Sequence, residues 1–194
     1  VYSASGEYGA VCAITSADLV RCWGNNTYGQ TSVPSDLGTV KYVFAEEMHS
    51  CAITTSNLVR CWGDNDYHET DVPSDLGAVK SITPGPAYTC AITATDLARC
   101  WGDNMYGQSK VPSNLGTVRS LSINATYGCA VTLSNLVRCW GSDAQGQLTG
   151  LPKVPEVELA FKSNLLTALA RNESFGFTKA WSWQRSSNGS KGPW

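Results

Sequence analysis

The residues with the clearest chemistry in this chain are its eight cysteines, which fall into four pairs, each with a separation of ten residues. Paired cysteines either form a disulfide or hold a metal ion such as zinc. Zinc sites place cysteines about two to four residues apart within one knuckle, so this spacing argues against zinc. We expect no metal and no cofactor, and we predict four disulfides: Cys12–Cys22, Cys51–Cys61, Cys90–Cys100 and Cys129–Cys139.

The segment between each pair of cysteines is typical of a β-hairpin. Apolar, β-rich stretches adjoin both cysteines, as in CAITTSNLVRCW (51–62), and turn residues lie midway. If Ala17 is the centre of the first turn, Cys12 faces Cys22. Directly opposed residues have Cβ atoms about 4.5–5.5 Å apart, close to disulfide range. The disulfides in turn predict that the protein is secreted or lies in the lumen of an oxidising compartment or organelle.

The cysteine pairs belong to a sequence repeat with a period of 39 residues, because the first cysteines stand at 12, 51, 90 and 129. We therefore divide the chain into four regular repeats, 1–39, 40–78, 79–117 and 118–156, and a divergent fifth repeat with a tail, 157–194. In the fifth repeat both cysteine positions hold alanine, at Ala168 and, two residues late, at Ala180. Loss of both together is what a bonded pair predicts, since neither leaves a free thiol.

Each regular repeat predicts three short strands. An extended segment such as VKYVFA (40–45) comes first, a second strand enters the first cysteine, and a third ends in Cys-Trp-Gly. A polar loop and a linker such as SVPSDLG (32–38) follow, and the proline of the linker is unsuited to a central strand. Short, regularly spaced strands predict an all-β propeller or solenoid. The segment VELAFKSNLLTALARN (157–172) also fits an amphipathic helix, but we favour strands because Val157 and Ala168 keep the repeat phase.

The combination of Cys-Trp-Gly-Asp-Asn, Tyr-Gly-Gln and Val-Pro-Ser-Asp-Leu-Gly resembles the repeats of the regulator of chromosome condensation superfamily. The short period is most similar in style to the secreted bacterial propellers that inhibit β-lactamases. The resemblance implies a β-propeller of about five short, three- to four-stranded blades. Two arrangements stay open: a five-blade ring, or part of a larger ring completed by other chains. The resemblance does not imply one function, because this superfamily serves several.

One tryptophan and one arginine recur in each regular repeat. The tryptophans follow the second cysteine, so they point to the face opposite the disulfide, where we expect them to pack between neighbouring blades. The arginines precede the second cysteine, and we expect each to pair locally with a carboxylate or a turn carbonyl rather than form an anion site. The residues concerned are Trp23, Trp62, Trp101 and Trp140, with Arg21, Arg60, Arg99 and Arg138.

Catalysis has little support in the sequence. His49 and His68 are the only histidines and occupy non-equivalent repeat positions, and no known catalytic motif is present. The Asp and Asn residues after each Cys-Trp-Gly supply too few acidic oxygens for calcium, so we expect them to cap turns. We therefore expect a protein that is not an enzyme.

The amino-acid composition of the chain limits the kinds of partner that we expect it to bind. The chain is 42% hydrophobic and 15% charged, which is typical of a globular protein, and its net charge of −2 gives no reason to bind nucleic acid. No apolar run approaches the roughly 20 residues of a membrane-spanning helix, so we expect no membrane insertion. Loop tips vary while the scaffold repeats, a pattern compatible with a binding surface.

Two functions follow as hypotheses. The first is a non-catalytic protein-interaction module or structural subunit of a larger assembly in an oxidising compartment. The second is a lectin with one shallow site per blade, which would stack sugars on Tyr28, Tyr67 and Tyr106 and anchor them on Asn26, Asn65 and Asn104.

The fifth repeat and tail are the predicted docking surface for a partner chain. The tail SSNGSKGPW (186–194) is a poor closing strand because it contains glycines and a proline. The apolar contacts would come from Phe161, Leu165, Leu166, Phe175, Phe177, Trp181 and Trp183. Four sequons are candidates for N-glycosylation: Asn25, Asn124, Asn172 and Asn188.

Overall fold

The computed structural model describes residues 3–7, 9–146, 148, 156–162, 165–171 and 178–183, with side chains described for 9–146 and 148. Every regular element in these ranges is a β-strand, so the all-β prediction is confirmed. The chain divides into two compact units, 1–150 and 151–194. Within the described residues, none of the segments forms a helix long and apolar enough to cross a membrane.

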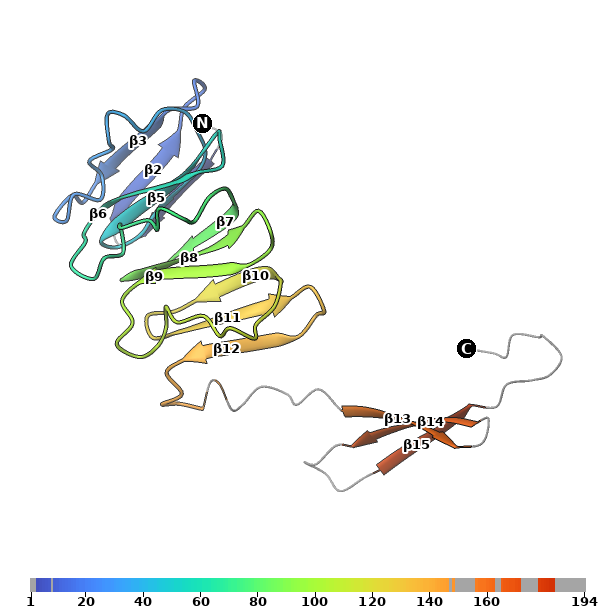
Figure 1. The fold of residues 1–194 in the computed structure, drawn as a ribbon. Helices are drawn as coiled ribbons and strands as arrows, with labels where there is room; N and C mark the ends of the chain where they lie inside the picture. The colour runs from blue at the N-terminus through green and yellow to red at the C-terminus, as the bar shows by residue number, and fades with distance from the viewer. Residues whose placement is uncertain are drawn as a thin grey trace. The chain divides into compact units, whose positions relative to one another are not determined.

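The first unit contains four antiparallel sheets of three strands, which we call blades 1 to 4 (Figure 1). In each sheet the strands are neighbours in chain order, because short hairpin turns connect them. The strands are β1 (Ser3–Glu7), β2 (Ala10–Ile14) and β3 (Val20–Gly24) in blade 1; β4 (Val40–Ala45), β5 (His49–Thr54) and β6 (Val59–Gly63) in blade 2; β7 (Val79–Pro84), β8 (Tyr88–Thr93) and β9 (Ala98–Gly102) in blade 3; and β10 (Val118–Ile123), β11 (Tyr127–Thr132) and β12 (Val137–Gly141) in blade 4.

The hairpin between the second and third strands fixes the register of the cysteines. In blade 2, Asn57 adopts a left-handed conformation with φ of 66°, which asparagine tolerates better than most residues. The Thr54 hydroxyl accepts a hydrogen bond from the main-chain N–H of Leu58 at 3.0 Å and closes the turn. The resulting register places Cys51 opposite Cys61, and the equivalent hairpins oppose the other pairs.

All four predicted disulfides are present: Cys12–Cys22, Cys51–Cys61, Cys90–Cys100 and Cys129–Cys139. Each closes the two-strand hairpin of its own blade. Within the described residues no cysteine is free. The prediction of one intra-blade disulfide in each of the first four blades is therefore confirmed.

The hydrophobic core lies between neighbouring blades rather than inside any one sheet. The cluster between blades 1 and 2, for example, joins Ile14 and Val20 of blade 1 to Val43 and Trp62 of blade 2. The linker contributes a leucine to each such cluster, and the first valine of the next blade is buried beside it. These residues are Leu37, Leu76 and Leu115, with Val40, Val79 and Val118. A single blade cannot bury both of its faces, so stacking supplies the core.

The glycine after each tryptophan permits a close approach of two strands. Gly63 has φ of +113°, and a Cβ atom at this position would lie 2.6 Å from the Met48 carbonyl oxygen. Any larger residue would therefore strain the backbone and collide with the start of β5.

The second unit contains one further three-stranded antiparallel sheet, made of β13 (Glu156–Lys162), β14 (Leu165–Arg171) and β15 (Thr178–Trp183). Strands rather than a helix are thus confirmed for the fifth repeat. Its register differs from expectation, however. Ala168 lies opposite Trp181, and Ala180 lies opposite Leu169, so the two alanines that replace the cysteines are not a directly opposed pair. The register is therefore one residue away from the one that would oppose the two alanines.

Candidate interaction surface

Tryptophan side chains connect each blade to the one before it. Trp62, Trp101 and Trp140 are only 6%, 7% and 5% exposed. Their indole N–H groups donate to the main-chain carbonyls of Gln30, Glu69 and Gln108 on the preceding blade at 2.9, 2.9 and 2.8 Å. Both the apolar ring and its polar atom are therefore satisfied at the interface, which confirms the predicted packing role for these three residues.

Trp23 differs from its three equivalents, because its side chain is 54% exposed. The indole partners of the other tryptophans come from the loop of the preceding blade, and no described residue occupies that place for Trp23. The prediction that all four tryptophans pack between blades is therefore wrong for Trp23. In the described part of the chain, the Trp23 ring is thus not covered by another blade.

Two of the recurring arginines form ion pairs across the blade boundary. Arg60 binds Asp36 in a bidentate arrangement at 2.9 and 3.1 Å, and Arg99 binds Asp75 at 2.9 and 3.2 Å. The arginine lowers the pKa of each carboxyl group through a hydrogen bond and through its charge. The predicted local pairing is confirmed for both.

Arg21 and Arg138 lack such a carboxylate among the described residues. For Arg138, the linker position equivalent to Asp36 and Asp75 holds Asn114. Both arginine side chains are exposed.

Residues in the last position of the Tyr-Gly-Gln motif bridge neighbouring blades through their side chains. Gln30 donates its amide N–H to the Glu47 carbonyl at 2.9 Å, and Gln108 donates to the Ala125 carbonyl at 3.4 Å. In blade 2 the motif reads Tyr67-His68-Glu69, and one carboxyl oxygen of Glu69, Oε1, is buried without a partner. The other oxygen accepts the Tyr67 N–H at 2.8 Å. Burial raises the pKa of Glu69, and the negative charges of Asp64 and Asp66 raise it further.

Replacing Glu69 with glutamine is expected to stabilise the protein at neutral pH by roughly 1 kcal/mol or more, because an amide can donate where the ionised carboxylate cannot. A raised folded-state pKa means that the folded state binds the proton more tightly than the unfolded chain. The advantage of Glu69→Gln over the wild type should therefore be full above the folded pKa and shrink as the pH falls toward the unfolded value. Urea unfolding at several pH values measures it.

Gln30→Glu provides the matched control, since it places the same carboxyl group at the boundary of blades 1 and 2. It is expected to destabilise the protein at neutral pH and to lose that penalty on acidification. An advantage of Glu69→Gln that does not change with pH would contradict the assigned ionisation.

His49 is fully buried at the boundary of blades 2 and 3, where its Nε2 lies 3.0 Å from the Thr89 hydroxyl. Burial lowers the pKa of His49 from 6.5 to about 4, so the ring is neutral at physiological pH. His68 is exposed and bonds Asp71 at 2.8 Å. The two histidines therefore lie in different environments. In the described residues, no group of three or more potential metal-binding side chains converges.

The loops after β3, β6 and β9 carry exposed large side chains, which we call the tip surface: Tyr28, Tyr67, Met105 and Tyr106. The tyrosines are 46%, 46% and 53% exposed, and Met105 is 73% exposed. The loops that follow β6 and β9 lie on the same side of the stack (Figure 1). Equivalent loops of blades 1, 2 and 3 thus expose large side chains to solvent.

The asparagines near these tyrosines stabilise their own loops. The side chain of Asn26 accepts the Thr31 N–H at 2.9 Å and donates to Ser32 at 3.0 Å. Asn65 likewise accepts from Thr70 at 3.1 Å and donates to Asp71 at 3.0 Å. Two of the three amides expected to anchor a sugar therefore already have partners, whereas the predicted turn-capping role of this Asp/Asn set is supported.

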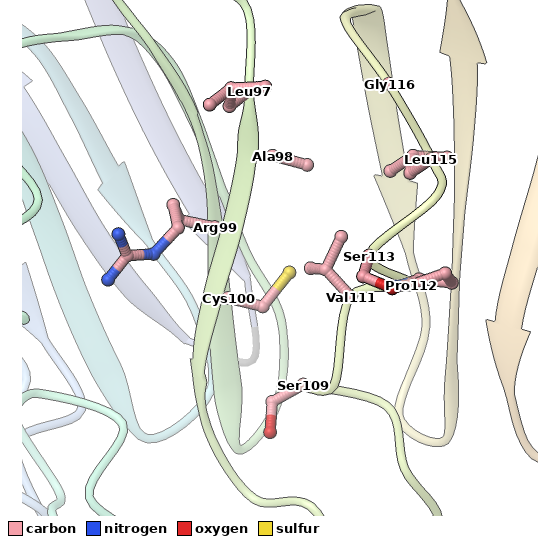
Figure 2. Close-up of a pocket in the computed structure, with 10 residues that line it drawn as sticks. All are labelled: Leu97, Ala98, Arg99, Cys100, Ser109, Val111, Pro112, Ser113, Leu115 and Gly116. Atoms are coloured by element: carbon pink, nitrogen blue, oxygen red, sulfur yellow. The ribbon is translucent and has the colours of Figure 1, made fainter.

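A groove runs between the third strand and the linker of blade 3, with a volume of about 370 Å³. Figure 2 shows Cys100 pointing from β9 toward Val111 of the linker, while the Arg99 side chain points away from the groove. Blade 1 has an equivalent groove of about 500 Å³ between β3 and residues 31–38. The disulfide and the linker thus shape a repeated surface feature.

Some predicted site residues lie where side chains are not described. Phe161, Leu165, Leu166, Trp181 and Trp183 are on the strands of the second unit. Phe175, Phe177, Asn172 and Asn188 lie outside the described residues. The other two sequons, at Asn25 and Asn124, have exposed side chains.

The fold and the repeated blade contacts define an all-β propeller protein in which each of the first four blades contains one disulfide. The family model for the regulator of chromosome condensation (RCC1) repeat matches residues 4–30 and 49–69. No curated protein matches the chain. The repeat match and the propeller fold support the predicted resemblance to RCC1-type β-propellers.

Several solved structures share this fold. The ectodomain of the receptor kinase CR4 from Physcomitrella patens matches with a TM-score of 0.64 and 21% identity over 93% of this chain and 53% of that one. The CRINKLY WD40 ectodomain of the Arabidopsis thaliana receptor kinase ACR4 matches with a TM-score of 0.61 and 20% identity over 93% and 70%. Prp20p from Saccharomyces cerevisiae matches with a TM-score of 0.62 and 15% identity over 72% and 44%. The chain thus spans about half the length of the CR4 ectodomain.

Proposed function

We propose that this chain is a non-catalytic protein-interaction module, or a structural subunit of a larger assembly, in an oxidising compartment. The observation that carries the proposal is the tip surface, where Tyr28, Tyr67 and Tyr106 repeat at one position on loops held by rigid sheets. Tyrosine offers a large, amphipathic contact area at a low cost in conformational entropy, and aromatic side chains are enriched at protein interfaces. Such a surface favours a role in protein binding over a role in catalysis.

The compartment is proposed from the disulfides. Disulfides persist outside the cell and in oxidising lumens, and reducing compartments keep most thiols free. Two structural relatives are ectodomains of receptor kinases, which is compatible with an extracellular location. Four disulfides in 194 residues are consistent with the same compartment.

A protein partner is favoured over a glycan by the hydrogen bonds of the loops. A lectin site needs free polar groups beside the stacking ring, and Asn26 and Asn65 already bond within their loops. Their release would require the loops to rearrange.

The second unit is proposed as an additional docking surface. Its strands carry the apolar residues Phe161, Leu165, Leu166, Trp181 and Trp183, and the proposed set also includes Phe175 and Phe177. A partner chain would bury these residues, since soluble proteins rarely expose large contiguous apolar patches.

The triple variant Tyr28→Ser, Tyr67→Ser, Tyr106→Ser is expected to lose most of the binding to the partner while its unfolding free energy stays within about 1 kcal/mol of the wild type, because these side chains are exposed. Affinity capture from the native secretory fluid or organelle lumen, quantified by mass spectrometry, measures the binding.

The matched control is Leu19→Ser, Leu58→Ser, Leu97→Ser, which changes equally exposed apolar residues at the hairpin ends. If the tyrosine variant alone fails to capture the partner, the result supports the tip surface as the binding site. Equal capture by wild type and tyrosine variant would contradict it. Capture abolished by prior removal of glycans would instead favour the lectin.

A further inference from the structure

The two cysteines of a disulfide differ in exposure in blades 1, 2 and 3, whose disulfides face a following blade. The first cysteine is fully buried in all three of these blades: Cys12, Cys51 and Cys90. The second cysteine is partly exposed: Cys22, Cys61 and Cys100. In thiol–disulfide exchange, an incoming thiolate attacks one sulfur, and the other sulfur leaves as a thiolate. The burial therefore assigns attack to the second cysteine and makes the first cysteine the leaving group.

The groove between the third strand and the linker gives a small molecule access to the second cysteine. Cys22 and Cys100 line the grooves of blades 1 and 3. Figure 2 shows the Cys100 sulfur pointing toward Val111 of the linker. The groove of blade 3, at about 370 Å³, is large enough for a small ligand. The linker of blade 2, TDVPSDLG (70–77), has the same pattern, so we expect an equivalent approach to Cys61.

The buried sulfur of Cys51 has a hydroxyl group beside it. The Sγ atom of Cys51 lies 3.9 Å from Thr89 Oγ1, and the same oxygen lies 3.0 Å from Nε2 of His49. All three residues are fully buried at the boundary of blades 2 and 3. A hydroxyl has a single proton, so the direction of that proton decides whether Thr89 can stabilise a leaving thiolate.

The ring of His49 determines where the Thr89 proton points. Burial lowers the pKa of His49 to about 4, so the ring is neutral and carries one N–H. Nδ1 of His49 is buried and has no hydrogen-bond partner in the described residues. A buried N–H without an acceptor is rarer than a buried acceptor without a donor, so we place the proton on Nε2. Nε2–H then donates to Thr89 Oγ1, which leaves the Thr89 proton to point to Cys51 Sγ.

The disulfides of blades 1 and 3 lack this arrangement. Ser50 holds the equivalent position beside Cys12, also at 3.9 Å, but its hydroxyl donates to the Gln30 carbonyl at 2.8 Å. Gly128 holds the equivalent position beside Cys90 and has no hydroxyl. A hydroxyl with a proton available to a leaving thiolate is therefore specific to blade 2 among these three blades.

We propose that Cys61 is a site of covalent modification by a small-molecule thiol, which enters by exchange with the Cys51–Cys61 disulfide. The incoming thiolate attacks Cys61 Sγ and forms a mixed disulfide with it. The bond between the two cysteines breaks, and Cys51 leaves as a thiolate that accepts a hydrogen bond from Thr89. One S–S bond replaces another, so the step needs no oxidant and no net transfer of a proton. The site is separate from the tip surface and does not depend on the proposed interaction role.

The test incubates the full chain with reduced glutathione near neutral pH and stops the exchange with acid. Free thiols are then blocked with N-ethylmaleimide, and the peptides are mapped by mass spectrometry. Among blades 1, 2 and 3, glutathione is expected first on Cys61, with maleimide on Cys51.

Thr89→Val removes the hydroxyl and retains the branched shape of the side chain. It should slow the glutathione adduct of Cys61 about tenfold, the effect of one hydrogen bond to a charged group, and leave the rate at Cys22 unchanged. Ser50→Ala is the matched control, because it removes the hydroxyl whose proton is already used by the Gln30 carbonyl. It should leave the rates at Cys61 and Cys22 unchanged.

His49→Phe tests the part of His49, which acts only through the Thr89 hydroxyl. It should slow the Cys61 adduct in the wild-type background and have no further effect in Thr89→Val, whereas a general structural role would affect both backgrounds. The proposal is overturned if Cys61 forms no adduct, or if glutathione appears first on Cys51, Cys22 or Cys100. It is also overturned by an equal rate at Cys61 in Thr89→Val and the wild type, or by equal slowing at Cys22.

Discussion

Trp101→Ala is expected to lower the free energy of unfolding by about 3–5 kcal/mol, the range for removal of a large buried aromatic side chain. The side chain is 7% exposed and packs in the cluster between blades 2 and 3 with Ile53, Leu76 and Val79. The change also removes the hydrogen bond to the Glu69 carbonyl. Urea unfolding followed by circular dichroism measures the loss.

The same substitution at Trp23 is the natural control, because its repeat position is identical but its side chain is 54% exposed. Trp23→Ala is expected to cost no more than about 0.5 kcal/mol, as at most surface sites. Comparable losses for the two variants would show that the Trp23 ring is covered in solution and would contradict its exposure in the structure.

Reduction of the four disulfides is expected to have the other large effect. Each bond closes a hairpin between cysteines ten residues apart, and the loop-entropy model assigns such a loop about 3 kcal/mol. Four independent loops would together contribute on the order of 10 kcal/mol, comparable to the whole stability of a typical domain. Thermal unfolding with and without dithiothreitol should therefore show loss of most of the cooperative transition under reducing conditions.

The double variant Cys51→Ala, Cys61→Ala isolates one bond without leaving a free thiol. It should lose about 3 kcal/mol and retain the other three disulfides. Unchanged stability of the fully reduced protein would contradict the assigned role of these bonds.

The fold could be predicted largely from local patterns that repeat. The separation of the cysteines fixes the hairpin register, because only a centred turn opposes Cys51 and Cys61. The tryptophans have a fixed relation to the disulfides, since adjacent residues of a strand face opposite sides. Both features depend on residues that lie close together in the sequence of one repeat. They can therefore be predicted from the sequence of that repeat alone.

Features that depend on contacts between repeats were harder to predict. Trp23 has the same local sequence as Trp62, and only the lack of a preceding blade among the described residues makes it exposed. The importance of Glu69 was missed in the same way, although the change from Gln in Tyr-Gly-Gln to Glu was the available signal. In the fifth repeat, the register is one residue away from the one that the alanine positions suggested.

The candidate interaction surface was only partly accessible from sequence. Tyr28, Tyr67 and Tyr106 were recognisable as recurring loop aromatics, and the structure places them on exposed tips. The hydrogen bonds of Asn26 and Asn65 within their loops depend on how each loop folds back on itself. Residue type alone does not distinguish an amide that caps a loop from one that binds a ligand.

Site-specific photo-crosslinking tests the proposed interaction role most directly. A benzophenone amino acid replaces Tyr67 on the tip surface or, as a control, Leu58 at the exposed end of a hairpin of the same blade. After irradiation in the native secretory fluid or lumen, we expect the Tyr67 position to yield one dominant protein adduct that the Leu58 position does not. Equal adducts from both positions, or none from Tyr67, would contradict a protein partner at the tip surface.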